Sequence, residues 1–143
     1  MTLSNTRSRT TALPEIIISR PDFDALERLV GDLPAAGPAG LLQQELDRAE
    51  VVEAADMPHD VAMLKRWLHY VDARHEGVRR VQLVLPREAD IDAGLVSVLS
   101  HVGAGLIGLR EGHSILWPAP SGEIRKLALV LIEDADPIES VHH

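Results

Sequence analysis

The sequence predicts an α+β fold in which a short antiparallel pair of helices precedes a domain built mainly of strands. The helices are indicated by apolar residues that recur at three- and four-residue spacing in residues 23–33 and again in residues 41–49. The strands are indicated by alternation of apolar residues in residues 78–85 and by an apolar run on both faces in residues 123–133. Helices and strands segregated in this way are typical of the α+β class.

The first helix is predicted to begin at Ser19, directly after the short apolar run of residues 15–18. Ser19 and Asp22 form a capping-box pattern, and Pro21 stands in the first turn, where proline is tolerated. Two glycines and two prolines between residues 31 and 38 then break the helix and reverse the chain. The apolar face of this helix is expected to contain Phe23, Leu26, Leu29, Val30 and Leu33.

A second amphipathic helix is predicted over residues 41–49. Its apolar stripe consists of Leu41, Leu42, Leu46 and Ala49. The positions expected to face water are Gln43, Gln44, Glu45, Asp47 and Arg48. Each helix has about 12 residues and is therefore about 18 Å long at about 1.5 Å per residue. The antiparallel hairpin that the two helices form is a short projection.

Periodicity alone does not decide whether the next segment, residues 61–72, is a helix or a strand. Its apolar residues fit helical spacing slightly better than the alternation of a strand, and both interpretations stay open at this point. Residues 78–85 alternate as a strand that ends at Pro86. The charged residues 87–92 are expected to form a surface loop.

The last third of the chain is predicted to hold more strands and one brief helix. Residues 95–99 are a short apolar strand candidate, and Ser100 is placed to cap a helix over residues 101–109. Residues 114–117 follow as another strand. The run at residues 123–133 is apolar on both sides, which predicts a central strand.

Composition excludes several classes of function. The chain has no cysteine, which rules out disulfides, thiolate metal sites and cysteine nucleophiles. A formal net charge of −8 opposes a phosphate backbone, so direct nucleic-acid binding is disfavoured. No apolar run reaches the roughly 18 residues of a membrane helix, and the first residues lack the apolar segment of a signal peptide. We expect a cytoplasmic protein with no membrane partner.

No residue pattern predicts a catalytic, cofactor or metal site. The sequence contains no phosphate-binding glycine loop, nucleophile elbow or metalloprotease motif. His59 and Asp60 are expected to form a turn, and the other histidines lack the spacing of a zinc site. Gly103, Gly105 and Gly108 imitate a dinucleotide motif, but no parallel β-α-β unit surrounds them. We expect neither enzymatic activity nor a cofactor.

Three segments in order resemble a known family. They are residues 45–49 (ELDRA), residues 57–61 (MPHDV) and residues 97–112 (SVLSHVGAGLIGLREG). Together they are similar to the Rnk group, described as regulators of nucleoside diphosphate kinase and related to the transcript-cleavage factors GreA and GreB. The likeness extends from about residue 16 to residue 133, nearly the whole chain.

The resemblance implies a division of the chain. Residues 13–53 would be the N-terminal helical hairpin, and residues 54–134 a GreA/GreB C-terminal-like domain. The implied domain is a curved antiparallel sheet with one packed helix, similar to the FKBP-type isomerases, and it decides residues 61–72 in favour of strand. Residues 1–12 and residues 135–143 remain as a mobile N-terminal tail and a C-terminal tail.

The resemblance also implies a monomer that binds RNA polymerase near its secondary channel in competition with the cleavage factors. The implied contacts are Asp32 in the turn of the hairpin and Ser100, His101, Gly103 and Arg110 around the brief helix. His101 stands where the family commonly carries proline. The cleavage factors resemble one another in a carboxylate pair at the tip of a long hairpin. This turn offers Asp32 alone, so transcript cleavage is not expected.

Two other functions remain open. The implied fold raises prolyl isomerisation, but such a site is an aromatic-lined pocket. The chain has four aromatic residues, scattered at Phe23, Trp67, Tyr70 and Trp117. Direct control of a nucleoside diphosphate kinase is the third possibility; we interpret the group's name as an indirect effect through gene expression.

Overall fold

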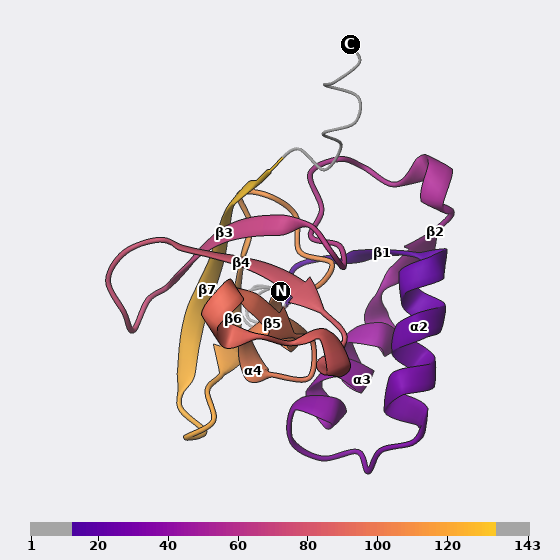
Figure 1. The fold of residues 1–143 in the computed structure, drawn as a ribbon, viewed down its shortest axis with the longest axis horizontal. Helices are drawn as coiled ribbons and strands as arrows, with labels where there is room; N and C mark the ends of the chain where they lie inside the picture. The colour runs from indigo at the N-terminus through magenta and orange to yellow at the C-terminus, as the bar shows by residue number, and fades with distance from the viewer. Residues whose placement is uncertain (1–12, 134–143) are drawn as a thin grey trace, which may run out of the picture.

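The computed structural model describes residues 13–133 and confirms the α+β class (Figure 1). The predicted tails lie outside the described residues. In chain order the elements are β1 (Ile17–Ser19), α2 (Arg20–Gly31), α3 (Gly37–Arg48), β2 (Glu50–Val52), η1 (Ala54–Asp56), β3 (Trp67–Asp72), β4 (Arg79–Val84), η2 (Pro86–Glu88), η3 (Ile91–Ala93), β5 (Leu95–Ser97), α4 (His101–Leu106), β6 (Ser114–Pro118) and β7 (Ile124–Ile132). Between residues 13 and 133, no helix has the length and apolar character needed to cross a membrane.

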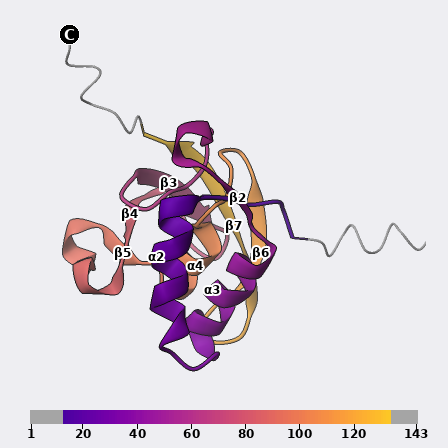
Figure 2. The same ribbon diagram turned by 90° about the vertical axis from the view of Figure 1, so that its right-hand side faces the viewer.

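The strands form one five-stranded sheet in the order β5-β4-β3-β7-β6 and a separate parallel pair, β1 with β2. Neighbours in the large sheet are antiparallel except β5, which runs parallel to β4. As predicted, β7 is an internal strand with a partner on each side. Figures 1 and 2 show α2 and α3 together on one side of the molecule, and α4 contacts both α3 and the sheet.

The helices begin where local chemistry favours a start. The Ser19 hydroxyl accepts a hydrogen bond from the Asp22 N–H at 3.4 Å, as the capping pattern predicts. The prediction for Leu33 was wrong, because α2 ends at Gly31 and leaves Leu33 exposed. The second helix starts at Gly37, four residues earlier than predicted. Pro38 explains this early start, because proline fits the first turn of a helix.

Glu45 is buried, which contradicts the prediction that it faces water. Its residue is 1% exposed, and its carboxylate accepts hydrogen bonds from Arg48 Nη2 at 2.7 Å and Nε at 3.0 Å. Arg48 also donates to the carbonyl of Pro14. Because α3 packs against both α2 and α4, its buried surface is wider than its apolar stripe. The ion pair makes burial of this charge tolerable.

The strand predicted over residues 61–72 is present only in its second half. The strand β3 begins at Trp67, and before it Val61 makes a single isolated bridge with Arg110. Lys65 has a φ of 70°, a left-handed conformation that interrupts an extended chain. Residues 61–66 therefore form an irregular connection rather than a strand.

The face of β7 that points away from the helices is open, although the sequence predicts cover on both sides. Val130 is 48% exposed and Leu131 is 45% exposed. Pairing with β3 moves from Leu129 to Leu131 across the adjacent residues His69 and Tyr70. The extra residue, Val130, is a β-bulge, and a bulge reverses the alternation of faces beyond it.

One hydrophobic core joins the two N-terminal helices to the sheet. The Ile17 N–H donates to the carbonyl of Gly108 at 3.1 Å. Gly108 has a φ of 81°, and a Cβ added there would lie 3.0 Å from the Cβ of Ile16. Only glycine combines this conformation with so close an approach. Fully buried members of the core include Ile16, Ile18, Leu26, Leu42, Leu106, Leu109 and Leu127.

Candidate partner-docking site

The first turn of α4 is fixed by Ser100 and Gly103. The Ser100 hydroxyl accepts from the Gly103 N–H at 2.9 Å and donates to the Ser97 carbonyl at 2.7 Å, so Ser100 caps the helix as predicted. Gly103 lies directly on the preceding turn, where an added Cβ would be 2.1 Å from the Ser97 oxygen. These two residues position the helix relative to β5.

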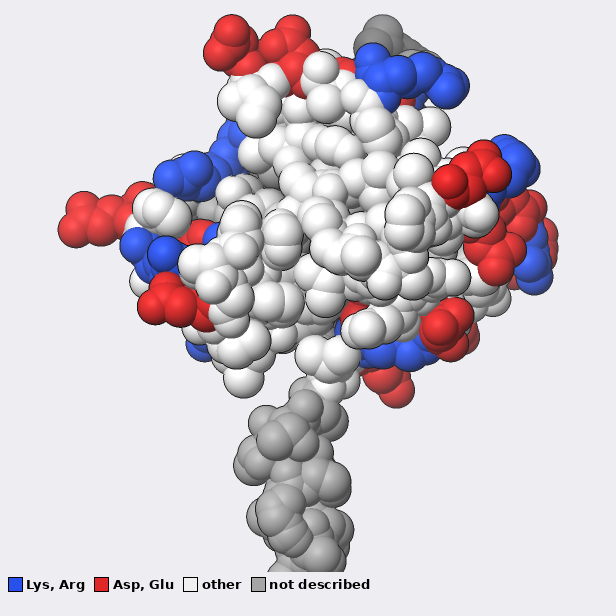
Figure 3. Space-filling view, turned by 90° about the horizontal axis from the view of Figure 1, so that it is seen from below, with Lys and Arg blue, Asp and Glu red and all other residues white. Residues whose placement is uncertain are grey.

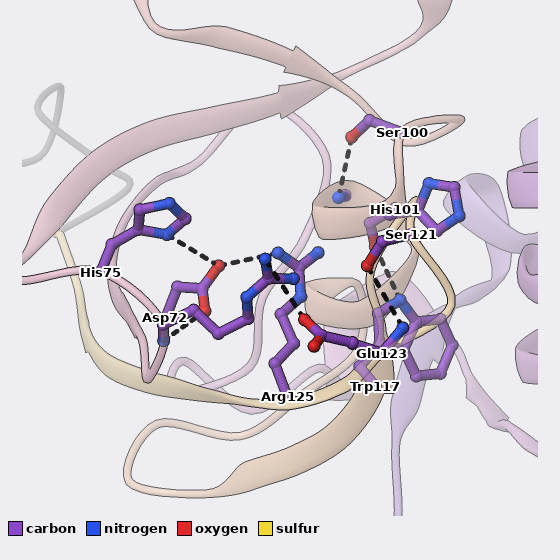
Figure 4. A network of polar contacts seen from close by, with 10 residues as sticks. Asp72, His75, Ser100, His101, Trp117, Ser121, Glu123 and Arg125 are labelled. Carbon is purple, nitrogen blue, oxygen red and sulfur yellow. Dashed lines mark hydrogen bonds and ion pairs between the residues drawn. The ribbon is translucent and has the colours of Figure 1, made fainter.

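Trp117 holds the same turn from the sheet. Its indole N–H donates to the carbonyl of His101 at 2.7 Å (Figure 4). Gly105 allows the close approach, since a Cβ at that position would lie 2.8 Å from the Trp117 ring. Trp117 thus fixes the backbone at His101, and the side chains of His101 and Val102 are half-buried at the surface.

A groove of about 600 Å³ lies beside the N-terminal end of α4. It is bounded by β3 and β4, by the segment from η3 to β5, by α4, and by the turn between β6 and β7 with the start of β7. Its lining combines apolar surface with three guanidinium groups. The lining residues are Tyr70, Arg79, Arg80, Val81, Ile91, Gly94, Val96, Ser100, His101, Val102, Pro120 and Arg125.

Two of the three arginines in the groove are held by carboxylates that are not part of its lining. Arg125 Nη1 donates to Asp72 at 2.7 Å, and Arg80 pairs with Glu133. Burial acts to raise the pKa of Asp72, but the hydrogen bond from the Arg74 N–H and the charge of Arg125 outweigh it and lower that pKa. The pair Asp72–Arg125 is therefore ionised under ordinary conditions.

The side of the molecule that carries α4 is poor in charge. Figure 3 shows this side from below Figure 1: its centre has no charged side chains, and acidic and basic residues gather around its edges. Three stretches of the chain contain no Asp, Glu, Lys or Arg, residues 33–40, residues 93–109 and residues 117–122, and their exposed and half-buried positions are therefore uncharged. An uncharged surface around a groove is typical of a protein–protein contact.

The two remaining predicted contacts, Arg110 and Asp32, are not in the lining of the groove. Arg110 Nη1 lies 3.0 Å from both carboxylate oxygens of Asp60 and so ties the irregular connection before β3 to the segment after α4. Asp32 is exposed at the C-terminal end of α2, in the connection to α3. The structure thus brings together Ser100, His101 and Gly103.

Sequence reasoning missed most of the groove. Tyr70 and Val81 lie on neighbouring strands, and their alternation could have placed both on the buried face of the sheet. Arg125 gave no such signal, because a charged residue inside an apolar strand is normally expected at the surface. Its burial depends on Asp72, which is 53 residues away in the sequence.

No group of three or more metal-ligating side chains comes together within residues 13–133. Asp60 is engaged by Arg110, and the carbonyl of His59 accepts a hydrogen bond from Arg66 at 2.8 Å. The His59–Asp60 pair thus takes part in local structural contacts.

Comparison with known proteins matches both parts of the chain. Residues 57–136 match the family model "Transcription elongation factor, GreA/GreB, C-term", and residues 14–52 match "Rnk N-terminus". The "Regulator of nucleoside diphosphate kinase" of Escherichia coli strain K12 is 34% identical over 122 residues, which cover 84% of this chain and 90% of that protein.

Elongation factors are also similar. "Transcription elongation factor GreA" of Syntrophobacter fumaroxidans is 32% identical over 93 residues, which cover 65% of this chain and 59% of that protein. The solved structure of a GreA/GreB elongation factor from Nitrosomonas europaea is 32% identical, with a TM-score of 0.65 and coverage of 83% of this chain and 98% of that one. With an Rnk N-terminus followed by a GreA/GreB C-terminal domain, this chain belongs to the Rnk group of the GreA/GreB family.

Proposed function

We propose that this chain is a transcription regulator that docks on RNA polymerase at the rim of the secondary channel. It competes there with GreA/GreB-type factors and does not stimulate transcript cleavage. The observation that carries the proposal is a GreA/GreB-type body joined to very short helices. Both α2 and α3 have 12 residues, which corresponds to about 18 Å at about 1.5 Å per residue. An arm of this length is suited to the mouth of a channel.

Docking takes place through the groove beside α4 and the uncharged surface around it. Ser100 and Gly103 set the position of the helix, and His101 and Val102 present side chains to the partner. Arg110 supports this region from the far end of α4 through its pair with Asp60. The surrounding uncharged face allows close apposition because few ions must be desolvated there.

The helical pair supplies the second contact, through its connection. Asp32 is the carboxylate in the described residues 31–37, and its side chain is exposed and accessible to a partner. A carboxylate that helps to hold a catalytic Mg²⁺ needs a second hard ligand close by. Asp32 has no such neighbour in the connection, so its role is a surface contact.

Competition on purified core polymerase tests the proposal. A labelled GreB-type factor should be displaced by this chain, and cleavage of backtracked RNA by that factor should fall as the chain is added. Val102→Asp, in the groove, should weaken competition at least about tenfold, the effect of about 1.4 kcal/mol. Val130→Asp, the same change on the exposed outer face, is the matched control and should compete normally.

Two outcomes would overturn the proposal. Failure of the chain to bind core polymerase at low salt would exclude the docking role. Cleavage of backtracked RNA by the chain alone would exclude the non-catalytic part. Val102 lies in the first turn of α4, where an acidic side chain is compatible with the helix, but its side chain also packs against the core. A thermal melt of Val102→Asp therefore accompanies the competition assay, and only a variant that melts like the parent counts.

One alternative is direct control of a nucleoside diphosphate kinase, which the name of the Escherichia coli relative favours. Mixing the purified chain with the kinase separates the two functions. Under our proposal the kinase keeps its activity at any ratio, and a dose-dependent change would support the alternative.

Prolyl isomerisation, the enzymatic alternative, receives less support from the groove. Tyr70 is the aromatic residue among those that line it within the described chain. An isomerase pocket is closed by several aromatic rings around the proline. A standard peptide isomerisation assay should show no rate increase with this chain.

A further inference from the structure

We propose that the groove beside α4 recognises a carboxylate on the polymerase segment that docks there, and that Arg79 and Arg125 are the residues that recognise it. This inference rests on the proposed docking function and adds the chemistry of the partner: an acidic side chain next to an aliphatic one.

Arg125 occupies a position where an apolar residue would be expected. It precedes Leu127 and Leu129 on the buried face of β7, and its side chain is only 6% exposed. Nη1 donates a hydrogen bond to Asp72 at 2.7 Å (Figure 4). Its Nε and Nη2 have no hydrogen-bond partner among residues 13–133. Both atoms are buried, so an acceptor reaches them only when docking opens the groove, and such a contact would recover the free energy that unpaired buried donors cost.

The surroundings of Arg125 keep it in place. Asp72, its counter-ion, accepts a second hydrogen bond from the Arg74 N–H at 2.9 Å, and His75 Nδ1 lies 3.4 Å from it. Figure 4 shows the Arg125 side chain between Asp72 and His75 on one side and the Ser100–His101 turn on the other. A buried ion pair is usually no more stable than an apolar pair of the same volume. Recognition of a partner is a reason for retaining the pair at the base of a groove.

Arg79 adds a charge that no described carboxylate neutralises. It is exposed at the groove and makes no ion pair within residues 13–133. Burial raises the pKa of the Tyr70 hydroxyl, and the nearby Arg79 opposes that shift. Arg80 contributes less, because Glu133 holds its guanidinium.

The residues that line the groove are basic although the molecule is acidic, and Asp72 and Glu133 behind the lining pair with two of its three arginines. The chain carries a net charge of −8, but the described lining of this groove holds three arginines and no Asp or Glu. Val81, Val96 and Val102 supply aliphatic surface between the basic groups. A segment that presents a carboxylate beside an aliphatic side chain matches both features. A segment that presents Lys or Arg would be repelled by the arginines of the groove.

Titration of core polymerase with charge variants tests the inference. Arg79→Glu should weaken binding about tenfold or more and make the affinity less dependent on salt. The double variant Asp72→Asn with Arg125→Met removes both members of the buried pair, so that neither charge is left alone, and should also weaken binding. Arg87→Glu, the same charge reversal at an exposed position outside this groove, is the matched control and should bind within about twofold of the parent.

The outcomes separate this inference from the proposed function. One result would overturn the inference: Val102→Asp abolishes binding while Arg79→Glu and the double variant bind like the parent. The groove would then bind the polymerase without recognising a carboxylate. If Arg87→Glu weakens binding as much as Arg79→Glu, general electrostatics and not the groove is responsible. If the parent chain itself does not bind, both proposals fall together. Thermal melts of each variant identify losses due to unfolding, and Arg79→Glu, at an exposed position, remains informative if the double variant does not fold.

Discussion

Gly103→Ala is expected to destabilise the chain by about 3 kcal/mol. The added methyl group would lie 2.1 Å from the Ser97 oxygen and 2.9 Å from the Val98 Cα, where ordinary contacts begin at 3.4 Å. The obstructing atoms belong to the backbone of the turn between β5 and α4. A side-chain rotation cannot relieve the clash, so α4 must move away from the turn.

Two terms make up the expected magnitude. Forcing an extra methyl group into a packed site costs about 1–3 kcal/mol. Moving α4 also stretches the cap bond from the Gly103 N–H to the Ser100 hydroxyl, now 2.9 Å, and a helix cap contributes about 1 kcal/mol. Relaxation is limited because α4 carries Leu106, which is fully buried. The sum lies at about 2–4 kcal/mol.

Urea unfolding followed by tryptophan fluorescence measures this change, because Trp117 packs on α4. Gly31→Ala is the control: no atom lies within 4 Å of its added methyl group, and alanine favours the helix by about 0.5–1 kcal/mol. An unfolding midpoint for Gly103→Ala equal to that of the parent would refute the steric reasoning. If such a stable variant also failed to bind polymerase, Gly103 would be a contact residue and not a spacer.

Three further changes test the polar contacts. Glu45→Ala leaves its arginine partner without a carboxylate, so a loss of about 3 kcal/mol is expected in urea unfolding, and no loss would show that the pair is not needed. Burial raises the pKa of Asp22 above its ordinary 3.8. The folded state then holds that proton longer than the unfolded state, so the contribution of Asp22 to stability falls as pH rises through this region. Asp22→Asn should flatten this fall in thermal melts, and unchanged slopes would contradict it. The pKa of Glu133 is lowered to about 2, chiefly by its hydrogen bond from Arg80. Its contribution is full above about pH 4.5 and is lost as pH falls toward 2, so Glu133→Gln should be less sensitive to acid in that range, and an identical acid profile would count against the contact.

Features set by neighbouring residues could be predicted from the sequence. Ser19 and Ser100 cap their helices because a hydroxyl next to free N–H groups needs only local geometry. The internal position of β7 was also predicted, although the apolar run on which that prediction rests is not covered on both faces.

Features set by distant residues could not be predicted in this way. Glu45 is buried because α3 is enclosed by two other helices, which its own periodicity does not encode. The bulge at Val130 follows from pairing with β3, and it changes the face of every residue beyond it. Arg125 becomes an interior residue only because the chain returns Asp72 to its side.

The sequence did not predict the groove, and the expected partner contacts meet it only at α4. Ser100, His101 and Gly103 came from the family resemblance, and they share the turn that the structure places at the groove. The opposite wall comes from β3 and β4, and its residues have no motif that marks them. A concave surface made by four separate segments depends on the packing of the sheet, which no single stretch of sequence specifies.

The hydrogen bond between Ile17 and Gly108 and the close packing of Gly108 on Ile16 fix the two N-terminal helices against the sheet domain. The distance from Asp32 to the turn at Ser100 is therefore preset. Under the proposed docking, a partner that engages one end would find the other end already aligned, so the second contact would cost little additional rotational entropy. A surface whose two complementary patches are spaced differently would gain only one of the two contacts, so the proposed docking would select targets by the distance between their patches.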